Sequence, residues 1–196
     1  MSGTALRGRD GGARWGVRPV PRWLRGAEET VAGVFARRGF DGVRMEDLVA
    51  ATGVPRATLY YHFSGKEAVL EWLLRSTLGE LGEAVGGAVD QPGTGRRRLE
   101  LVVRAVLGLV GRRPAACGVL IADLERAGRL PEIADGIAAA FHRPVIDLLA
   151  AGAADGSLRP VADPVRVASA IFGAVTIPAL QSLVGEPVFA EEAVAA

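Results

Sequence analysis

The chain is poor in the residues that build disulfides and metal sites. It has one cysteine, Cys117, two histidines, His62 and His142, and a single lysine among its 23 basic residues. A lone thiol excludes an internal disulfide framework, which needs at least one pair. One cysteine and two histidines are too few for the usual zinc sites built on Cys and His. We therefore expect no metal and no other cofactor, and a protein of the reducing cytoplasm.

Long apolar runs are also scarce. The first 25 residues lack the uninterrupted apolar core of a secretory signal, because Gly, Arg and Pro recur from Gly8 to Arg25. One uncharged stretch, residues 167–185, reaches 19 residues, the length at which a membrane span has to be considered. Ser169, Thr176 and Gln181 dilute its hydrophobicity, which favours a buried helix and leaves a membrane-associated protein as an alternative.

Net charge of one sign is missing, because 23 basic residues face 22 acidic ones. No overall field therefore favours nucleic acid. The distribution is uneven, however: six arginines and only one acidic residue, Asp10, lie between Met1 and Arg25. Five glycines and the absence of a helical apolar stripe in this stretch predict a basic, flexible arm over residues 1–20.

Signatures of catalysis are absent from the sequence as well. It contains no G-x-S-x-G nucleophile elbow and no phosphate-cradling P-loop. We assign no catalytic residue and expect a binding protein rather than an enzyme.

Beyond residue 26 almost every segment has the period of an amphipathic helix. A first helix, with Val31, Val34 and Phe35 on one face, should end at Gly39. Ser64 and Glu67 have the spacing of a capping box, which predicts the start of another helix. That helix is expected to break between Gly86-Gly87 and Gly95.

Proline and glycine mark the limits of the later helices, expected at about 97–111, 114–127, 131–154 and 164–184. Pro144 and Pro178 lie inside two of them and should kink them. No segment combines strand alternation with hairpin turns, so the fold class expected is all-α.

The most informative segment is a pair of short helices expected around residues 46–51 and 55–62. Thr52-Gly53-Val54 joins them, and glycine permits the left-handed backbone of a tight turn. This spacing is typical of a helix-turn-helix. If Leu59 and Phe63 face inward, the helical wheel turns the two tyrosines, 60 and 61, outward, where they can contact DNA or pack on a neighbouring helix. Arg56, at the start of the second helix, can reach a guanine edge.

These residues resemble the TetR family of bacterial transcription regulators over about residues 27–74. The specific part is Gly53-Val54, Thr58-Leu59-Tyr60-Tyr61-His62-Phe63 and Lys66-Glu67. By position, the resemblance implies DNA contacts at Arg44, Met45, Arg56, Thr58, Tyr60, Tyr61, His62 and Lys66. Lys66 would contact a phosphate. Glu28 departs from the family pattern, which usually has a large aliphatic residue there.

The resemblance further implies three segments: the arm (1–20), an N-terminal helix-turn-helix domain (21–75) and a helical domain for effector binding and dimerisation (76–196). A homodimeric repressor would bind a palindromic DNA operator and be released by a small-molecule effector. Candidate pocket residues are Trp72, Phe141, Phe172 and Thr176. A helical small-molecule-binding or membrane-associated protein that does not bind DNA is the alternative.

Two apolar stripes suggest where two copies would meet. The first comprises Ala138, Phe141, Val145 and Leu148, and the second Val167, Ile171, Ala174 and Val175. They predict a four-helix interface across a two-fold axis. Cys117 is interpreted as a buried, inert thiol, with a sensing role as the alternative.

Overall fold

The computed structural model describes residues 24–122 and 131–184, and the secondary structure in these ranges is helical. The short 3₁₀ helix η1 (Leu24–Ala27) is followed by α1 (Glu28–Gly42), α2 (Met45–Thr52) and α3 (Arg56–His62). The chain continues through α4 (Lys66–Val89), α5 (Gly95–Arg112) and α6 (Pro114–Ala122). After residues 123–130 come α8 (Pro131–Ile137), one π-helical turn (Ala138–His142), α9 (Arg143–Ala154) and α10 (Pro164–Val184). The basic arm lies outside the described residues.

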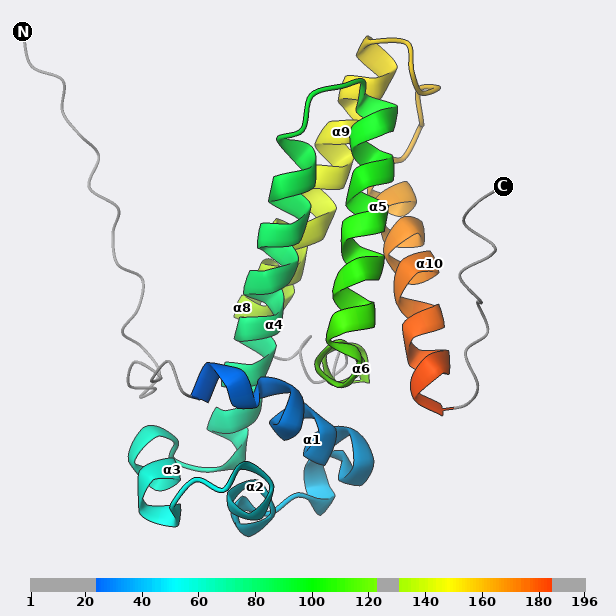
Figure 1. Cartoon of the computed structure of the whole chain (residues 1–196). Coiled ribbons are helices and arrows are strands. Elements are labelled where there is room, and N and C mark those ends of the chain that lie inside the picture. Colours follow the sequence, from blue (N-terminus) through cyan, green and yellow to red (C-terminus); the bar gives the residue numbers. More distant parts are fainter. Residues whose placement is uncertain (1–23, 123–130, 185–196) are drawn as a thin grey trace, which may run out of the picture.

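The helices form two groups that share α4 (Figure 1). Helices α1, α2 and α3 surround the beginning of α4, while its remainder packs with α5 and α9 in an elongated bundle. Helix α10 packs on α5, α6 and α9. Helix α6 crosses the lower end of α5, where it contacts α1. Because α4 runs across the expected domain boundary at residue 75, one continuous helix belongs to both groups.

The predicted turns of the first group are present. Gly39 has φ 65° and ψ 165° and interrupts α1, after which one short turn continues to Gly42. Gly53 ends α2 with φ 67° and ψ 7°, the left-handed conformation expected of the inter-helix turn. Both angles fall where a Cβ is unfavourable.

One predicted limit of α4 is wrong and the other is confirmed. The capping box at Ser64 does not form: α4 begins at Lys66 and its N-cap residue is Gly65, which has no side chain to accept from the first turn. The helix continues through Gly86-Gly87 to Val89, and its break at residues 90–94 falls within the predicted range, which ends at Gly95. Packing of the flanking Val85 and Ala88, both buried, offsets the intrinsic cost of helical glycine.

The prolines act differently from each other. Pro144 follows the π-helical turn directly. The wider turn accommodates a ring that would otherwise meet a carbonyl four residues earlier. Helix α10, in contrast, remains helical through Pro178.

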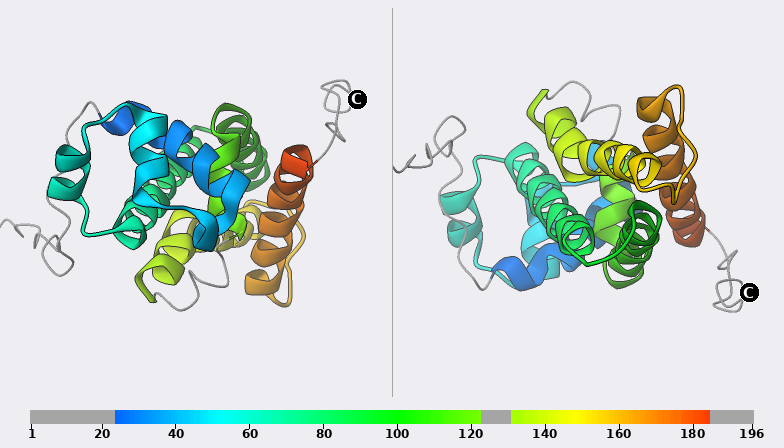
Figure 2. Two further views of the ribbon diagram at one scale, coloured as in Figure 1. Left: turned by 90° about the horizontal axis from the view of Figure 1, so that it is seen from below. Right: turned by 90° about the horizontal axis from the view of Figure 1, so that it is seen from above.

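The second group buries one of the two predicted dimer stripes in its own core. Phe141, Val145 and Leu148 are at most 2% exposed. That stripe therefore belongs to the subunit interior, which corrects the expectation. Helix α10 lies at the edge of the bundle (Figure 2). By length and composition alone, Ile133–Ala154 could cross a membrane; in the structure this segment packs against α4 and α5.

Candidate DNA-binding site

Helix α3 is anchored along one side. Leu59 and Phe63 are each 1% exposed, and the Phe63 ring packs against Trp72 of α4 with 5.6 Å between ring centroids. Val54, in the turn before α3, is buried beside them. These contacts fix the orientation of a helix that is too short to be stable alone.

The opposite side of α3 is open to solvent, as the helical wheel predicts. Tyr60 is 41% exposed and Tyr61 is 61% exposed. Ala57 is exposed between them and the helix start. Two large aromatic side chains are thus presented outward by a helix whose other face is immobilised, an arrangement that suits contact with base edges and the sugar-phosphate backbone.

Arg56 is oriented by two neighbours. Its Nη1 lies 3.0 Å from Oε1 of Glu46 in α2, and its guanidinium stacks over the Tyr60 ring at 5.3 Å from the centroid. Glu46 is not among the residues that the sequence predicts for this site. The sequence feature that could have indicated this ion pair is an acidic residue in the first turn of α2, the helix that precedes Arg56.

The remaining predicted contact residues divide by exposure. Arg44, directly before α2, is exposed, while Thr58 and His62 are half-buried. The ring of His62 meets that of Tyr61 edge-on, with 5.1 Å between centroids. Met45 is 7% exposed and belongs to the core of the first helix group, so its side chain packs rather than points outward.

Lys66 makes its contacts within the protein. Its Nζ donates to the carbonyl oxygens of Phe40, Asp41 and Val43 at 2.9, 3.3 and 3.1 Å, and lies 4.6 Å from the centroid of the Phe40 ring. These carbonyls close the end of α1. A cation there complements the negative end of the helix dipole, which is a structural role different from the phosphate contact that the sequence predicts.

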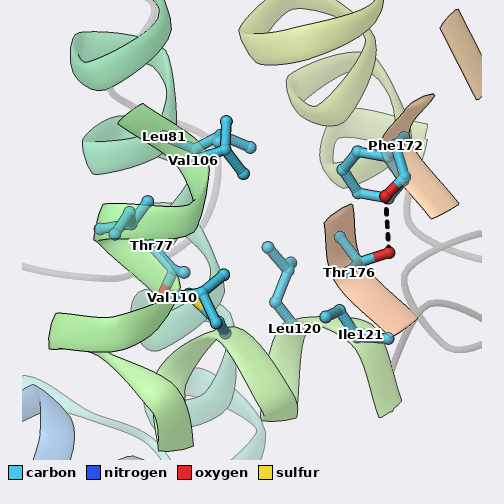
Figure 3. A pocket seen from close by; sticks show the side chains of 10 residues that line it. Thr77, Leu81, Val106, Val110, Leu120, Ile121, Phe172 and Thr176 are labelled. Carbon is cyan, nitrogen blue, oxygen red and sulfur yellow. Dashed lines mark hydrogen bonds between the residues drawn. The ribbon is translucent and has the colours of Figure 1, made fainter. Parts of the chain in front are cut away.

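An apolar cavity lies in the second helix group (Figure 3). Its lining comes from α4, α5, α6 and α10 and comprises Thr77, Leu81, Val106, Leu109, Val110, Cys117, Leu120, Ile121, Phe172 and Thr176. The hydroxyls of both threonines donate to main-chain carbonyls of their own helices, at 2.8 Å. The free volume is about 30 Å³, room for on the order of one water molecule.

Two of the four predicted pocket residues lie in this wall, and two do not. Phe172 and Thr176 line the cavity. Trp72 packs under the recognition helix instead, and Phe141 is fully buried behind Phe172, with 5.1 Å between their ring centroids. The three aromatic residues are candidates as large apolar side chains, but side-chain character cannot tell which buried residues border empty space.

Cys117 is 6% exposed and faces this cavity. Burial, reinforced by the negative charge of Glu29, raises the pKa of its thiol to about 11. At neutral pH the group is therefore a protonated, unreactive thiol, as expected for a buried cysteine.

Comparison with known proteins agrees with this geometry. Residues 30–73 match the family model of bacterial regulatory proteins, tetR family. The HTH-type transcriptional repressor KstR2 of Mycolicibacterium smegmatis is 26% identical over 137 residues, which cover 69% of this chain and 67% of KstR2.

Two solved structures share the fold. AibR in complex with isovaleryl coenzyme A and operator DNA matches with a TM-score of 0.66 and 24% identity, over 79% of this chain and 84% of AibR. FadR from Bacillus subtilis in complex with stearoyl-CoA matches with a TM-score of 0.70 and 19% identity, over 85% of this chain and 90% of FadR.

The anchored α3, its exposed aromatic face and the left-handed turn before it define a helix-turn-helix DNA-binding protein. The chain is similar to the TetR family of transcriptional regulators, whose family model its residues 30–73 match.

Proposed function

We propose that this protein is a cytoplasmic, homodimeric transcriptional repressor that binds a palindromic DNA operator and is released by a small apolar effector. It acts by binding and not by catalysis. The observation that carries the proposal is the exposed Tyr60 and Tyr61 on a helix that is immobilised from behind. Two such helices, one from each subunit, would enter successive major grooves about 34–36 Å apart.

The DNA contacts proposed are Arg56, Thr58, Tyr60, Tyr61 and His62 on α3, with Arg44 at the start of α2. Glu46 keeps the guanidinium of Arg56 extended beside Tyr60. A guanidinium held in this way is prepared for a bidentate contact with guanine, which discriminates between bases by about 1–3 kcal/mol. The arm at residues 1–20 would add phosphate contacts that do not depend on sequence.

The homodimer would use the outer face of α10. Val165 and Ile177 are 61% and 55% exposed, and Ala170 and Ala174 lie exposed between them. Small side chains flanked by large apolar ones allow two helices to approach closely while burying apolar area. The expected second copy packs the same face against it in an isologous interface. Light scattering at micromolar concentration should give the mass of a dimer, and a stable monomer would contradict this interface.

The effector would occupy the cavity with a hydrocarbon group. The lining exposes carbon atoms, and both threonine hydroxyl protons are already donated to carbonyls. A charged or strongly polar group would lose its hydration there without compensation. Two relatives of the same fold, AibR and FadR, were solved with acyl-coenzyme A thioesters, which supports an acyl chain as the group that enters.

Selection from a random duplex DNA library with the full-length protein tests the DNA-binding proposal. We expect an inverted repeat with half-site centres about 10 base pairs apart. Fluorescence anisotropy should then show Tyr61→Ala binding that repeat at least about tenfold more weakly, since one lost base contact costs roughly 1–3 kcal/mol. Arg112→Gln, an exposed change on α5, is the control and should bind as wild type. Failure to enrich any sequence would refute the proposal.

A further inference from the structure

Arg113, the residue between α5 and α6, forms an ion-pair network that belongs to neither the DNA-contact face nor the cavity. Its Nη2 lies 3.7 Å from Glu28 Oε2, its Nε lies 3.5 Å from Glu29 Oε2, and its Nη1 donates to Glu80 Oε1. The Arg113 side chain is 19% exposed and that of Glu28 is 6% exposed. We call these four residues the Arg113 network.

The Arg113 network connects three helices at one point. Glu29 of α1 also accepts hydrogen bonds from the main-chain amides of Ala115 at 2.8 Å and Ala116 at 3.3 Å, in the first turn of α6. Ser76 of α4 donates to Glu28 at 2.9 Å. The departure of Glu28 from the family pattern thus has a structural explanation, because its carboxylate is held by Arg113 and Ser76.

Helix α6 is also a wall of the cavity. It turns away from α5 by 104° and contributes Cys117, Leu120 and Ile121 to the lining. Because the free volume holds on the order of one water molecule, a chain of several carbons can enter only if part of the wall moves. The two regions are adjacent along α6, because the Ala116 amide donates to Glu29 and the next residue, Cys117, lines the cavity.

Electrostatics opposes a movement of α6 that leaves α1 behind. Such a movement would separate Arg113 and the α6 amides from the carboxylates of Glu28 and Glu29. A buried charge that loses its partner is strongly destabilising, and Glu28 is almost fully buried. The lower-energy response is a joint displacement of α6 and α1.

We propose that the Arg113 network couples the cavity to the DNA-binding domain, with Glu29 and Arg113 as positioning residues that make α1 follow α6 when an apolar chain enters. This inference rests on the proposed function. It assigns the transmission to salt bridges between α1, α4 and α6 rather than to apolar packing alone.

The test uses Cys117, the only cysteine of the chain, as an attachment point inside the cavity. Full-length protein is labelled to completion, as followed by intact mass, with either methyl or decyl methanethiosulfonate. The Cys117 thiolate attacks the sulfenyl sulfur, which forms a mixed disulfide that carries the methyl or decyl group and releases methanesulfinate. Its affinity for the selected operator is then measured by anisotropy. The variants are Glu29→Gln and Arg113→Gln, and the matched controls are Glu83→Gln and Arg112→Gln, which change exposed neighbours. Thermal melts verify that each variant is folded.

In wild type and both controls, the decyl group should weaken DNA binding at least about tenfold relative to the methyl group, within the usual range of allosteric coupling. In Glu29→Gln the same decyl group should change the affinity less than about twofold. Equal weakening in wild type and Glu29→Gln would overturn the inference, and so would a decyl group without effect in wild type. Absence of DNA binding by unlabelled wild type would instead refute the proposed function.

Hydrogen exchange provides a readout that needs no DNA. Decyl attachment should speed amide exchange in α1, residues 28–42, in wild type and in Glu83→Gln, but not in Glu29→Gln. If amide exchange in α1 is the same in wild type with and without the decyl group, the inference is overturned, even if Arg113→Gln proves too unstable to use.

Discussion

Replacement of Lys66 by methionine separates a structural role from a DNA-contacting one. The ammonium of Lys66 is shared by three carbonyls at the end of α1, two in partly buried surroundings and one exposed. Methionine keeps most of the aliphatic stem but donates nothing. The carbonyls of Phe40 and Val43 would therefore lose a charged donor in a place where water reaches them poorly.

The cost follows from the three contacts. A hydrogen bond to a charged group contributes about 1.5–3 kcal/mol net, and the exposed contact to Asp41 contributes less because water can replace the donor. One ammonium serving three acceptors therefore stabilises the fold by about 2–4 kcal/mol in total. In a protein of this length, that corresponds to a decrease in melting temperature of roughly 5–12 °C.

Two measurements decide between the roles. Thermal unfolding of Lys66→Met should show the lower melting temperature, while the slope of log affinity against log salt for operator DNA stays at its wild-type value. Arg44→Met is the matched control: its side chain is exposed, so we expect an unchanged melting temperature and a slope that is smaller by about two, because each dimer loses two contacts. If Lys66→Met melts as wild type does and lowers the slope by about two, the structural role is refuted.

Three further predictions concern the second helix group. In Gly95→Ala the new Cβ would lie 2.3 Å from the main-chain nitrogen of Gly152, so α5 and α9 must separate and the free energy of unfolding should fall by about 1–3 kcal/mol. Gly87→Ala, which has open space around the new Cβ, should instead raise it by up to about 1 kcal/mol in the same denaturant titration. Equal effects of the two substitutions would contradict this packing. Because the pKa of Cys117 is raised to about 11, its reaction with a small disulfide reagent at pH 8 should be about 100-fold slower than that of an exposed thiol, and Glu29→Gln should lower that pKa and accelerate the reaction. Hydrogen bonds from Ser157 and from the Gly95 amide hold the pKa of Asp155 below its ordinary value. Its carboxylate therefore stabilises the fold above about pH 4, and this contribution is lost as the pH falls through the lowered folded pKa. The destabilisation caused by Asp155→Ala should accordingly shrink in acid, and a difference in melting temperature that stays constant between pH 7 and pH 2 would contradict this role of Asp155.

The recognition face could be predicted from the sequence because it depends on local spacing. Leu59 and Phe63 are four residues apart, so burying both turns Tyr61 outward on any helix and places Tyr60 on the flank beside it. Gly53 likewise adopts the left-handed turn that its position between two short helices requires. Such features are set within about one or two helical turns, and the packing of the rest of the chain does not change them.

Contacts between distant segments could not be predicted in this way. The capping box at Ser64 was a sound local expectation, yet α4 starts at Lys66, whose ammonium is engaged with carbonyls 23 to 26 residues earlier. Phe141 and Phe172 have the same apolar character, but only the second borders the cavity. Periodicity identifies an inward face, whereas cavity walls depend on how four helices are spaced.

The sequence by itself therefore determined which segments are helices, which of them is proposed to contact DNA and which side of that helix is outward, because backbone hydrogen bonds and the 3.6-residue repeat act over a few residues. Only the tertiary structure decided that Arg56 is held by Glu46, that Lys66 closes α1, and that Arg113 draws Glu28, Glu29 and Glu80 together. Charges interact through space irrespective of their separation along the chain, and their partners are fixed only when the helices have packed.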